Sequence, residues 1–217
     1  MIFILLVGII GGRVIPMFTA NASAAQKAAP IKLVELFSII PIVILIFVLL
    51  IGIEKFNALV IFGLSMSAAC ANLIRLSRWG VNHTWNKPIL WSLHIAYLFI
   101  PVGFILLALY SINLINNLSP IIHCFTLGAM SGMILAMISR VSLGHTARTI
   151  TAHPLIALAY ALIFFAAIIR VAVPILLAEY YQLGIAVSGL LWCLSFLLFF
   201  IVYLPILISK RVDGLPG

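Results

Sequence analysis

The chain has 217 residues, of which 65% are hydrophobic and only 7% are charged. This composition excludes a soluble globular domain, in which about a quarter of the residues are charged, and is typical of an integral membrane protein. The formal net charge is +8, but the basic residues lie between apolar segments and form no aromatic basic patch, which argues against a nucleic-acid-binding surface.

A helix needs roughly 20 apolar residues to cross the 30 Å or so of bilayer hydrocarbon. In chain order, seven segments satisfy this requirement, at residues 1–18, 34–52, 56–74, 89–111, 120–139, 154–178 and 184–208. We therefore predict an all-α fold, a polytopic transmembrane bundle of about seven helices that forms a single domain over residues 1–217. A secretory signal peptide is the competing interpretation of the first segment, although no basic region precedes it and Arg13 follows its apolar run.

The basic residues predict how the bundle is oriented. They concentrate after the odd-numbered segments, at Lys27, Lys32, Arg75, Arg78, Lys87, Arg140, Arg148, Lys210 and Arg211. The connections that follow the even-numbered segments carry at most one basic residue, Lys55. Because Lys and Arg are enriched in cytoplasmic loops, we predict that the N-terminus lies outside and the C-terminus in the cytoplasm.

The fifth segment predicts a helix with two different faces. At 100° per residue, three side chains fall within about 40° of one another on one face, and small residues lie on the opposite face. The first set is His123, Met130 and Met137, and the second is Gly128, Gly132 and Ala136. The small face predicts close helix packing, whereas the other face offers soft ligands, unless the methionines simply fill gaps in the core.

Four ionisable residues lie several positions inside the apolar segments, where burial of charge is costly and functional roles are common. At 1.5 Å per residue, Arg13 and His94 share a layer about 8 Å below the inner surface, and His123 and Arg170 share a layer in the outer leaflet. The two histidines are then about 16 Å apart along the membrane normal, so we predict that they do not ligate the same metal.

We find no carboxylate at either depth, which predicts that an anionic ligand pairs with the arginines. Imidazoles buried together with guanidinium groups suit haem, because histidine binds iron and arginine binds propionate, and copper is a second candidate metal for histidine. The alternative is that Arg13 reaches lipid phosphates and that His94 only hydrogen-bonds a backbone carbonyl.

Other chemistries find little support in the sequence. Cys70, Cys124 and Cys193 lack the spacing of a zinc site, and nucleotide-binding and hydrolytic motifs are absent.

Residues 138–148, "ISRVSLGHTAR", predict a basic cytoplasmic helix end, with Gly144 ending the helix and Arg140 facing the headgroups.

Three sequence blocks resemble the NnrS family of bacterial inner-membrane proteins. They are "GGRVIPMFTANA", "LHIAYLFIPVGF" and "HCFTLGAMSGMILAMISRVSLGHTAR". The resemblance implies binding of haem and copper and a role in the response to nitric oxide and nitrosative stress. It marks His94 and His123 as candidate metal ligands and Arg13, Arg140, His145 and Arg148 as candidate cofactor contacts. Arg170 is a further candidate cofactor contact because of its depth in the layer of His123.

Family members are about twice this length, so the chain resembles their C-terminal half. The resemblance therefore implies a partner, either the missing N-terminal half or another subunit. The resemblance also implies an interaction with nitric oxide or metal-nitrosyl species and does not decide whether the protein is an enzyme. Two alternatives remain open, a transporter or channel for a small anion and a non-catalytic membrane assembly subunit.

Overall fold

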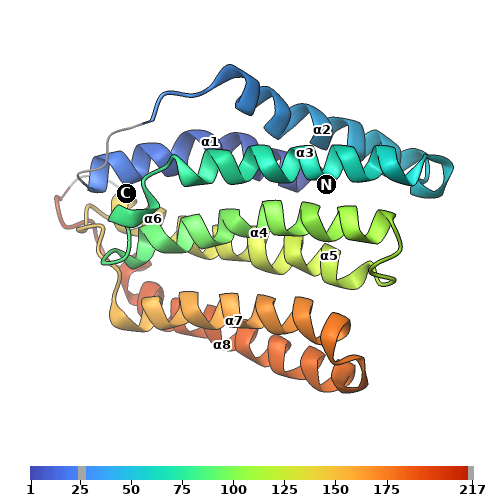
Figure 1. Cartoon of the computed structure of the whole chain (residues 1–217). Coiled ribbons are helices and arrows are strands. Elements are labelled where there is room, and N and C mark those ends of the chain that lie inside the picture. The colour runs from blue at the N-terminus through green and yellow to red at the C-terminus, as the bar shows by residue number, and fades with distance from the viewer. Residues whose placement is uncertain (24–27, 215–217) are drawn as a thin grey trace.

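The computed structural model describes residues 1–23 and 28–214, and these residues form a bundle of helices without strands (Figure 1). Within them, seven helices are long and apolar enough to cross a membrane, as the hydropathy pattern predicts. The spans are α1 (Ile2–Ala22), α2 (Lys32–Ile51), α3 (Ala58–Ser77), α4 (Pro88–Ser111), the continuous segment α5 (Ser119–His123), η3 (Cys124–Ser131) and α6 (Gly132–His145), α7 (Pro154–Leu176) and α8 (Tyr181–Leu207).

The helices are arranged in three layers. Figure 1 shows α1, α2 and α3 on one side, α4 with the α5–η3–α6 segment in the middle, and α7 with α8 on the other side. The middle layer holds the core, because 61% of the apolar stretch of α4 is buried, against 11% for α8. Side chains on the inner faces of the middle layer are therefore enclosed by the neighbouring helices.

The predicted small face of the fifth span packs directly against α4 and α7. A Cβ atom on Gly128 would collide with the Phe99 ring, and one on Gly132 would lie 2.6 Å from the Phe164 ring. Gly103 of α4 makes the reciprocal contact, since a Cβ there would lie 2.5 Å from Phe125. Small residues therefore let these backbones approach closely, as the sequence predicts.

The fifth span is not a uniform α-helix. Residues Cys124–Ser131 form a π-helix between α5 and α6. A π-helical stretch has more residues per turn than an α-helix, so it rotates the faces on either side of it relative to a 100° wheel. Such stretches are frequent at functional sites, and this one begins directly after His123.

The basic connections meet at one end of the bundle. Consecutive spans run in opposite directions, so residues 78–87 and 146–153 lie at the same end, and residues 52–57 and 112–118 lie at the other. Lys27, which contributes to the predicted charge pattern, lies outside the described residues. The common end is consistent with one basic membrane face, and its assignment to the cytoplasm stays a prediction.

The helix that carries Arg140 ends differently from the prediction. Gly144 does not end it, because α6 continues to His145. The chain leaves the helix through Ala147, a non-glycine residue with φ of 56°, whose N–H donates to the Gly144 carbonyl across 3.2 Å. The reversal therefore occurs three residues later than the glycine suggested.

Candidate functional site

His123 and Arg170 form a pair in the half of the bundle away from its basic end. Nδ1 of His123 donates to the Ser119 carbonyl across 2.7 Å, since a carbonyl can only accept. The other ring nitrogen, Nε2, therefore carries the lone pair and accepts from Nη2 of Arg170 on α7 across 3.2 Å. The structure thus places together the two residues that the depth argument assigned to the outer layer.

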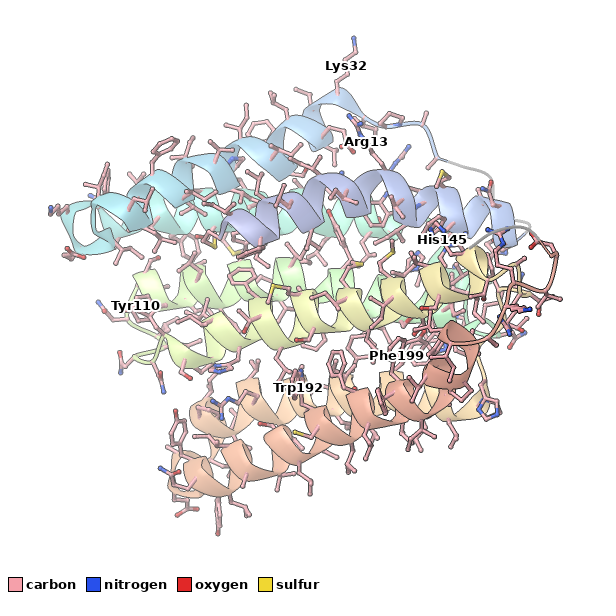
Figure 2. The ribbon with its side chains drawn as sticks, turned by 180° about the vertical axis from the view of Figure 1, so that it is seen from behind. Arg13, Lys32, Tyr110, His145, Trp192 and Phe199 are labelled. Atoms are coloured by element: carbon pink, nitrogen blue, oxygen red, sulfur yellow. The ribbon has the colours of Figure 1, made fainter. Side chains whose placement is uncertain are left out.

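The pair lines a cavity of ≈ 330 Å³ between the fifth span, α7 and α8. Polar side chains from two helices complete its wall: Thr126, Ser131, Ser188 and Trp192. Trp192 donates from Nε1 to the Ser131 hydroxyl across 3.4 Å, which joins α8 to the middle layer (Figure 2). The cavity combines an imidazole, a guanidinium and hydroxyl groups.

Met130 lines the same cavity as His123, as the helical wheel predicts, but Met137 does not line it. Met137 and Met130 together line a second cavity, against α1. The helical wheel assumed 100° per residue along the whole span. The intervening π-helix has more residues per turn, so it changes the angle between side chains that precede it and side chains that follow it. The predicted row of His123, Met130 and Met137 is therefore divided between two cavities that share Met130.

His94 lies in the core of α4, with only 2% of its surface exposed. Its Nδ1 donates to the Leu90 carbonyl across 3.0 Å, which is the carbonyl bond that the alternative interpretation requires. That bond uses only one ring nitrogen. Nε2 is buried without a hydrogen-bond partner among the described residues, although the Trp79 backbone also lies close to the ring.

The contacts between α4 and the fifth span show how far apart the two histidines lie. The two run antiparallel, with Gly132 opposite Ala96 and Gly103 opposite Phe125. This register sets His123 level with Ile105 of α4, and His94 precedes Ile105 by 11 positions, or roughly 16 Å at 1.5 Å per residue. The packing therefore supports two separate layers.

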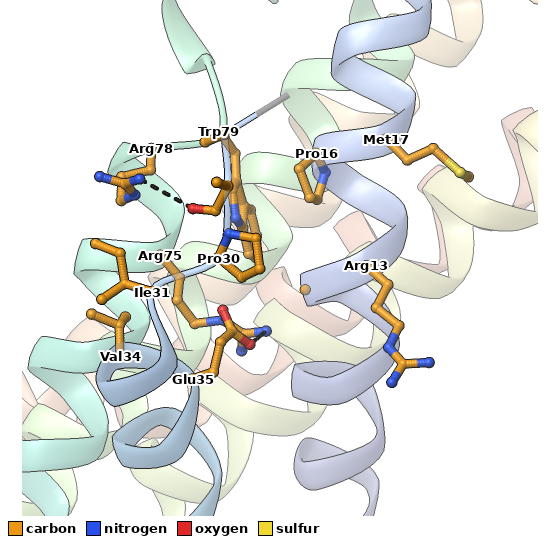
Figure 3. Close-up of a pocket in the computed structure, with 13 residues that line it drawn as sticks. Arg13, Pro16, Met17, Pro30, Ile31, Val34, Glu35, Arg75, Arg78 and Trp79 are labelled. Atoms are coloured by element: carbon orange, nitrogen blue, oxygen red, sulfur yellow. Dashed lines mark hydrogen bonds and ion pairs between the residues drawn. The ribbon is translucent and has the colours of Figure 1, made fainter. Parts of the chain in front are cut away.

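Arg13 does not take the place in the inner layer that the sequence suggests. Its side chain is exposed and makes no hydrogen bond or ion pair within residues 1–23 and 28–214. It lies at the wall of a cavity of ≈ 490 Å³, and Figure 3 shows its guanidinium pointing away from Arg75 and Glu35 inside that cavity.

Arg75 is a buried arginine in this layer, although its position after an apolar segment predicts only a topology marker. Its side chain is 3% exposed and pairs with Glu35 of α2 at 3.0 Å from Nη2. Nη1 donates to the Gly8 carbonyl across 3.1 Å and to the Tyr97 hydroxyl across 2.8 Å. The prediction that no carboxylate lies at this depth is therefore wrong, because Glu35 reaches into the bundle as the partner of Arg75.

The Arg75 network reaches the neighbourhood of His94. The Tyr97 hydroxyl donates to Asn72 across 2.5 Å, and Asn72 donates to the Ala68 carbonyl across 2.8 Å. Tyr97 also packs against Trp79, with ring centroids 4.5 Å apart, and lies one turn after His94 on α4. Two sequence signals pointed to this network, since Arg75 directly follows the third predicted segment and Glu35 lies inside the second.

The remaining predicted cofactor residues lie at the basic end of the bundle. The guanidinium of Arg140 stands 3.5 Å from the centroid of the Phe18 ring of α1, so it packs on a helix instead of facing only the headgroups. Nη2 of Arg148 donates to the Ser209 hydroxyl across 2.9 Å, and its Nη1 is buried without a partner among the described residues. His145 is exposed, at the opposite end of the bundle from Tyr110 (Figure 2).

Within the described residues, no group of three or more His, Cys, Asp or Glu side chains is arranged to hold a metal ion. Any metal held here by His94 or His123 therefore needs a further ligand of another kind, such as a thioether, or one from outside these residues.

The chain was also compared with known proteins. No curated protein matches it, and no solved structure matches it. A family model described as the NnrS protein matches residues 1–211. Because the match spans nearly the whole length and the described residues form seven apolar helices, the chain belongs to the NnrS family and is a multi-pass membrane protein.

Proposed function

We propose that this protein binds haem and copper in the bacterial inner membrane and acts in the response to nitric oxide and nitrosative stress. Family membership supports the proposal, and one structural observation carries it. His94 and His123 each donate from Nδ1 to the backbone carbonyl four residues earlier, which leaves Nε2 as the nitrogen that can bind a metal.

This arrangement is the one expected for metal-binding histidines. A ligating imidazole almost always donates its second N–H to a carbonyl or carboxylate, which fixes the tautomer and the orientation of the ring. At His94 the free Nε2 is buried and without a partner, and at His123 it faces a cavity that Met130 also lines. The residues present therefore fit a metal at each histidine.

The separation of the two histidines supports two metal centres instead of one. Two imidazoles on one iron hold their nitrogens about 4 Å apart, twice a typical metal–nitrogen bond. The register of α4 against the fifth span separates His94 and His123 by roughly 16 Å along the helix axis. We therefore propose that each histidine binds its own metal, without assigning haem or copper to either one.

The arginines supply charge for anionic groups of the cofactor. Arg170 lies nearest, since its Nη2 contacts His123 Nε2, and its guanidinium would be available to an anionic group if a metal took that nitrogen. Arg148 has an unused buried donor, whereas Arg13 is exposed and Arg140 packs on an aromatic ring. We assign these four arginines and His145 as candidate cofactor contacts. Haem or copper, when bound, would supply the open coordination position for nitric oxide.

An optical spectrum of the purified full chain, expressed with sufficient haem and copper, tests this function. We expect a reducible Soret band together with copper in the metal analysis. His94→Ala and His123→Ala are expected to remove separate signals, because the residues belong to different layers. His83→Ala is the matched control, since His83 is exposed in a connection outside the spans.

Two outcomes contradict parts of the proposal. Loss of the same centre from both histidine variants would refute the two-centre arrangement. Absence of any haem or copper signal from the folded protein would favour the alternatives, an anion transporter or channel or an assembly subunit. Anion uptake by proteoliposomes containing the protein separates those two alternatives.

A further inference from the structure

Half of the methionines in the chain line one cavity. The sequence has six methionines, and Met130, Met133 and Met137 all line a cavity of ≈ 280 Å³ between α1 and the fifth span. The facing wall consists of apolar side chains of α1, among them Val7, Ile10 and Val14. This cavity is distinct from the one beside Arg170, and Met130 belongs to the walls of both.

The spacing of the three methionines brings their side chains together. They follow one another at intervals of three and four residues, which are the neighbouring positions on a helix face. The corresponding rises are about 4.5 Å and 6 Å. Met133 is the middle one and is 8% exposed. Each side chain has three rotatable bonds, so the outer two thioethers can converge on the position of the middle one.

The chemistry of the cavity selects the ligand. No charged or titratable side chain lines it, so hard cations, which need carboxylate or water oxygen, find no partner there. Neutral thioethers are soft ligands that favour Cu(I). The cavity lies beside all three methionines and leaves room for an ion next to these side chains.

We propose that Met130, Met133 and Met137 form a thioether site for monovalent copper in the groove between α1 and α6. The site is separate from the two histidine centres and does not depend on their occupancy. Because Met130 lines both cavities, a copper ion bound at this site would lie beside the cavity of His123. The site binds Cu(I) without a change of its oxidation state.

Titration of the purified full chain with Cu(I) under anaerobic conditions, against a chromophoric Cu(I) chelator, tests the site. Replacement of all three methionines by leucine approximately keeps side-chain volume and removes the sulfur. We expect loss of one Cu(I) equivalent, or binding weakened by roughly tenfold or more. X-ray absorption of the wild type should show copper–sulfur scattering, which the triple variant loses. Zn(II) should not compete for this equivalent.

Met66→Leu on α3 is the matched control and should bind Cu(I) as the wild type does. The His94→Ala, His123→Ala double variant should keep the sulfur-bound copper, so the thioether site and the histidine centres can succeed or fail separately. Circular dichroism and thermal unfolding show whether the triple variant is folded. A folded triple variant that keeps wild-type Cu(I) binding, or a wild type without copper–sulfur scattering, overturns the proposal and leaves the groove to a lipid chain or another helix.

Discussion

Arg75 of α3 donates a hydrogen bond to the Tyr97 hydroxyl of α4 across 2.8 Å, inside a bundle composed mainly of apolar side chains. The same guanidinium binds Glu35 of α2 and the Gly8 carbonyl of α1. One buried cation therefore joins four helices. Because a charge in the membrane interior is costly unless it is paired, this arginine holds the first layer of the bundle to the middle layer.

Replacement of Arg75 by alanine should destabilise the protein strongly. The substitution would leave a carboxylate, a hydroxyl and a carbonyl without their donor. We expect the free energy of unfolding to fall by about 3 kcal/mol, the lower end of the range for breaking a buried ion pair, because the Glu35 side chain is 36% exposed. Thermal unfolding in detergent measures the change. Arg78→Ala is the control, because Arg78 is exposed and, within the described residues, donates to the Ala29 carbonyl. Equal stability of the two variants would contradict this role of Arg75.

Replacement of Gly128 by alanine should also destabilise the bundle. The added Cβ collides with the Phe99 ring between the fifth span and α4, and overpacking of this kind costs about 1–3 kcal/mol. Gly63→Ala is the matched control, since nothing lies within 4 Å of a Cβ at that helical position. The control should be neutral or stabilising by up to about 1 kcal/mol, because alanine is the better helix former. Unchanged unfolding of Gly128→Ala would show that this helix contact is loose.

Replacement of Arg170 by glutamine should weaken cofactor retention without unfolding the protein. Loss of one hydrogen bond to a charged group costs about 1.5 kcal/mol, which is roughly a tenfold change in affinity. Arg170→Lys keeps the charge and should retain part of the affinity. Haem content after gel filtration measures the effect, with Arg211→Gln as the control, because Arg211 pairs with Asp213 near the chain end. Full retention in Arg170→Gln would remove Arg170 from the cofactor contacts.

Cysteine labelling tests the predicted orientation. Lys87 precedes α4 at the basic end of the bundle, and Glu179 lies between α7 and α8 at the other end. By the positive-inside rule, a membrane-impermeant thiol reagent added to spheroplasts should label Glu179→Cys and should label Lys87→Cys only after the membrane is opened. The variants are made in a chain whose native cysteines are replaced by serine. The opposite labelling pattern would invert the bundle.

The sequence by itself determined the features that depend on composition along one helix. Length and hydropathy predicted the seven spans, and the spacing of Gly128 and Gly132 predicted the packed face. Counting residues from the span ends predicted the shared layer of His123 and Arg170. These inferences succeeded because bilayer thickness and helical rise convert sequence position into depth without knowledge of which helices are neighbours.

The tertiary structure decided the features that depend on neighbouring helices. Depth alone could not tell that Arg13 faces outward while Arg75 is enclosed, because the direction in which a side chain points depends on how its helix is rotated in the bundle. Glu35 and Arg75 are 40 positions apart in the chain, and only the packing of α2 against α3 makes them a pair. The π-helix likewise separates His123 from Met137, which line different cavities, since it changes the rotation per residue in a way that a fixed helical wheel does not include.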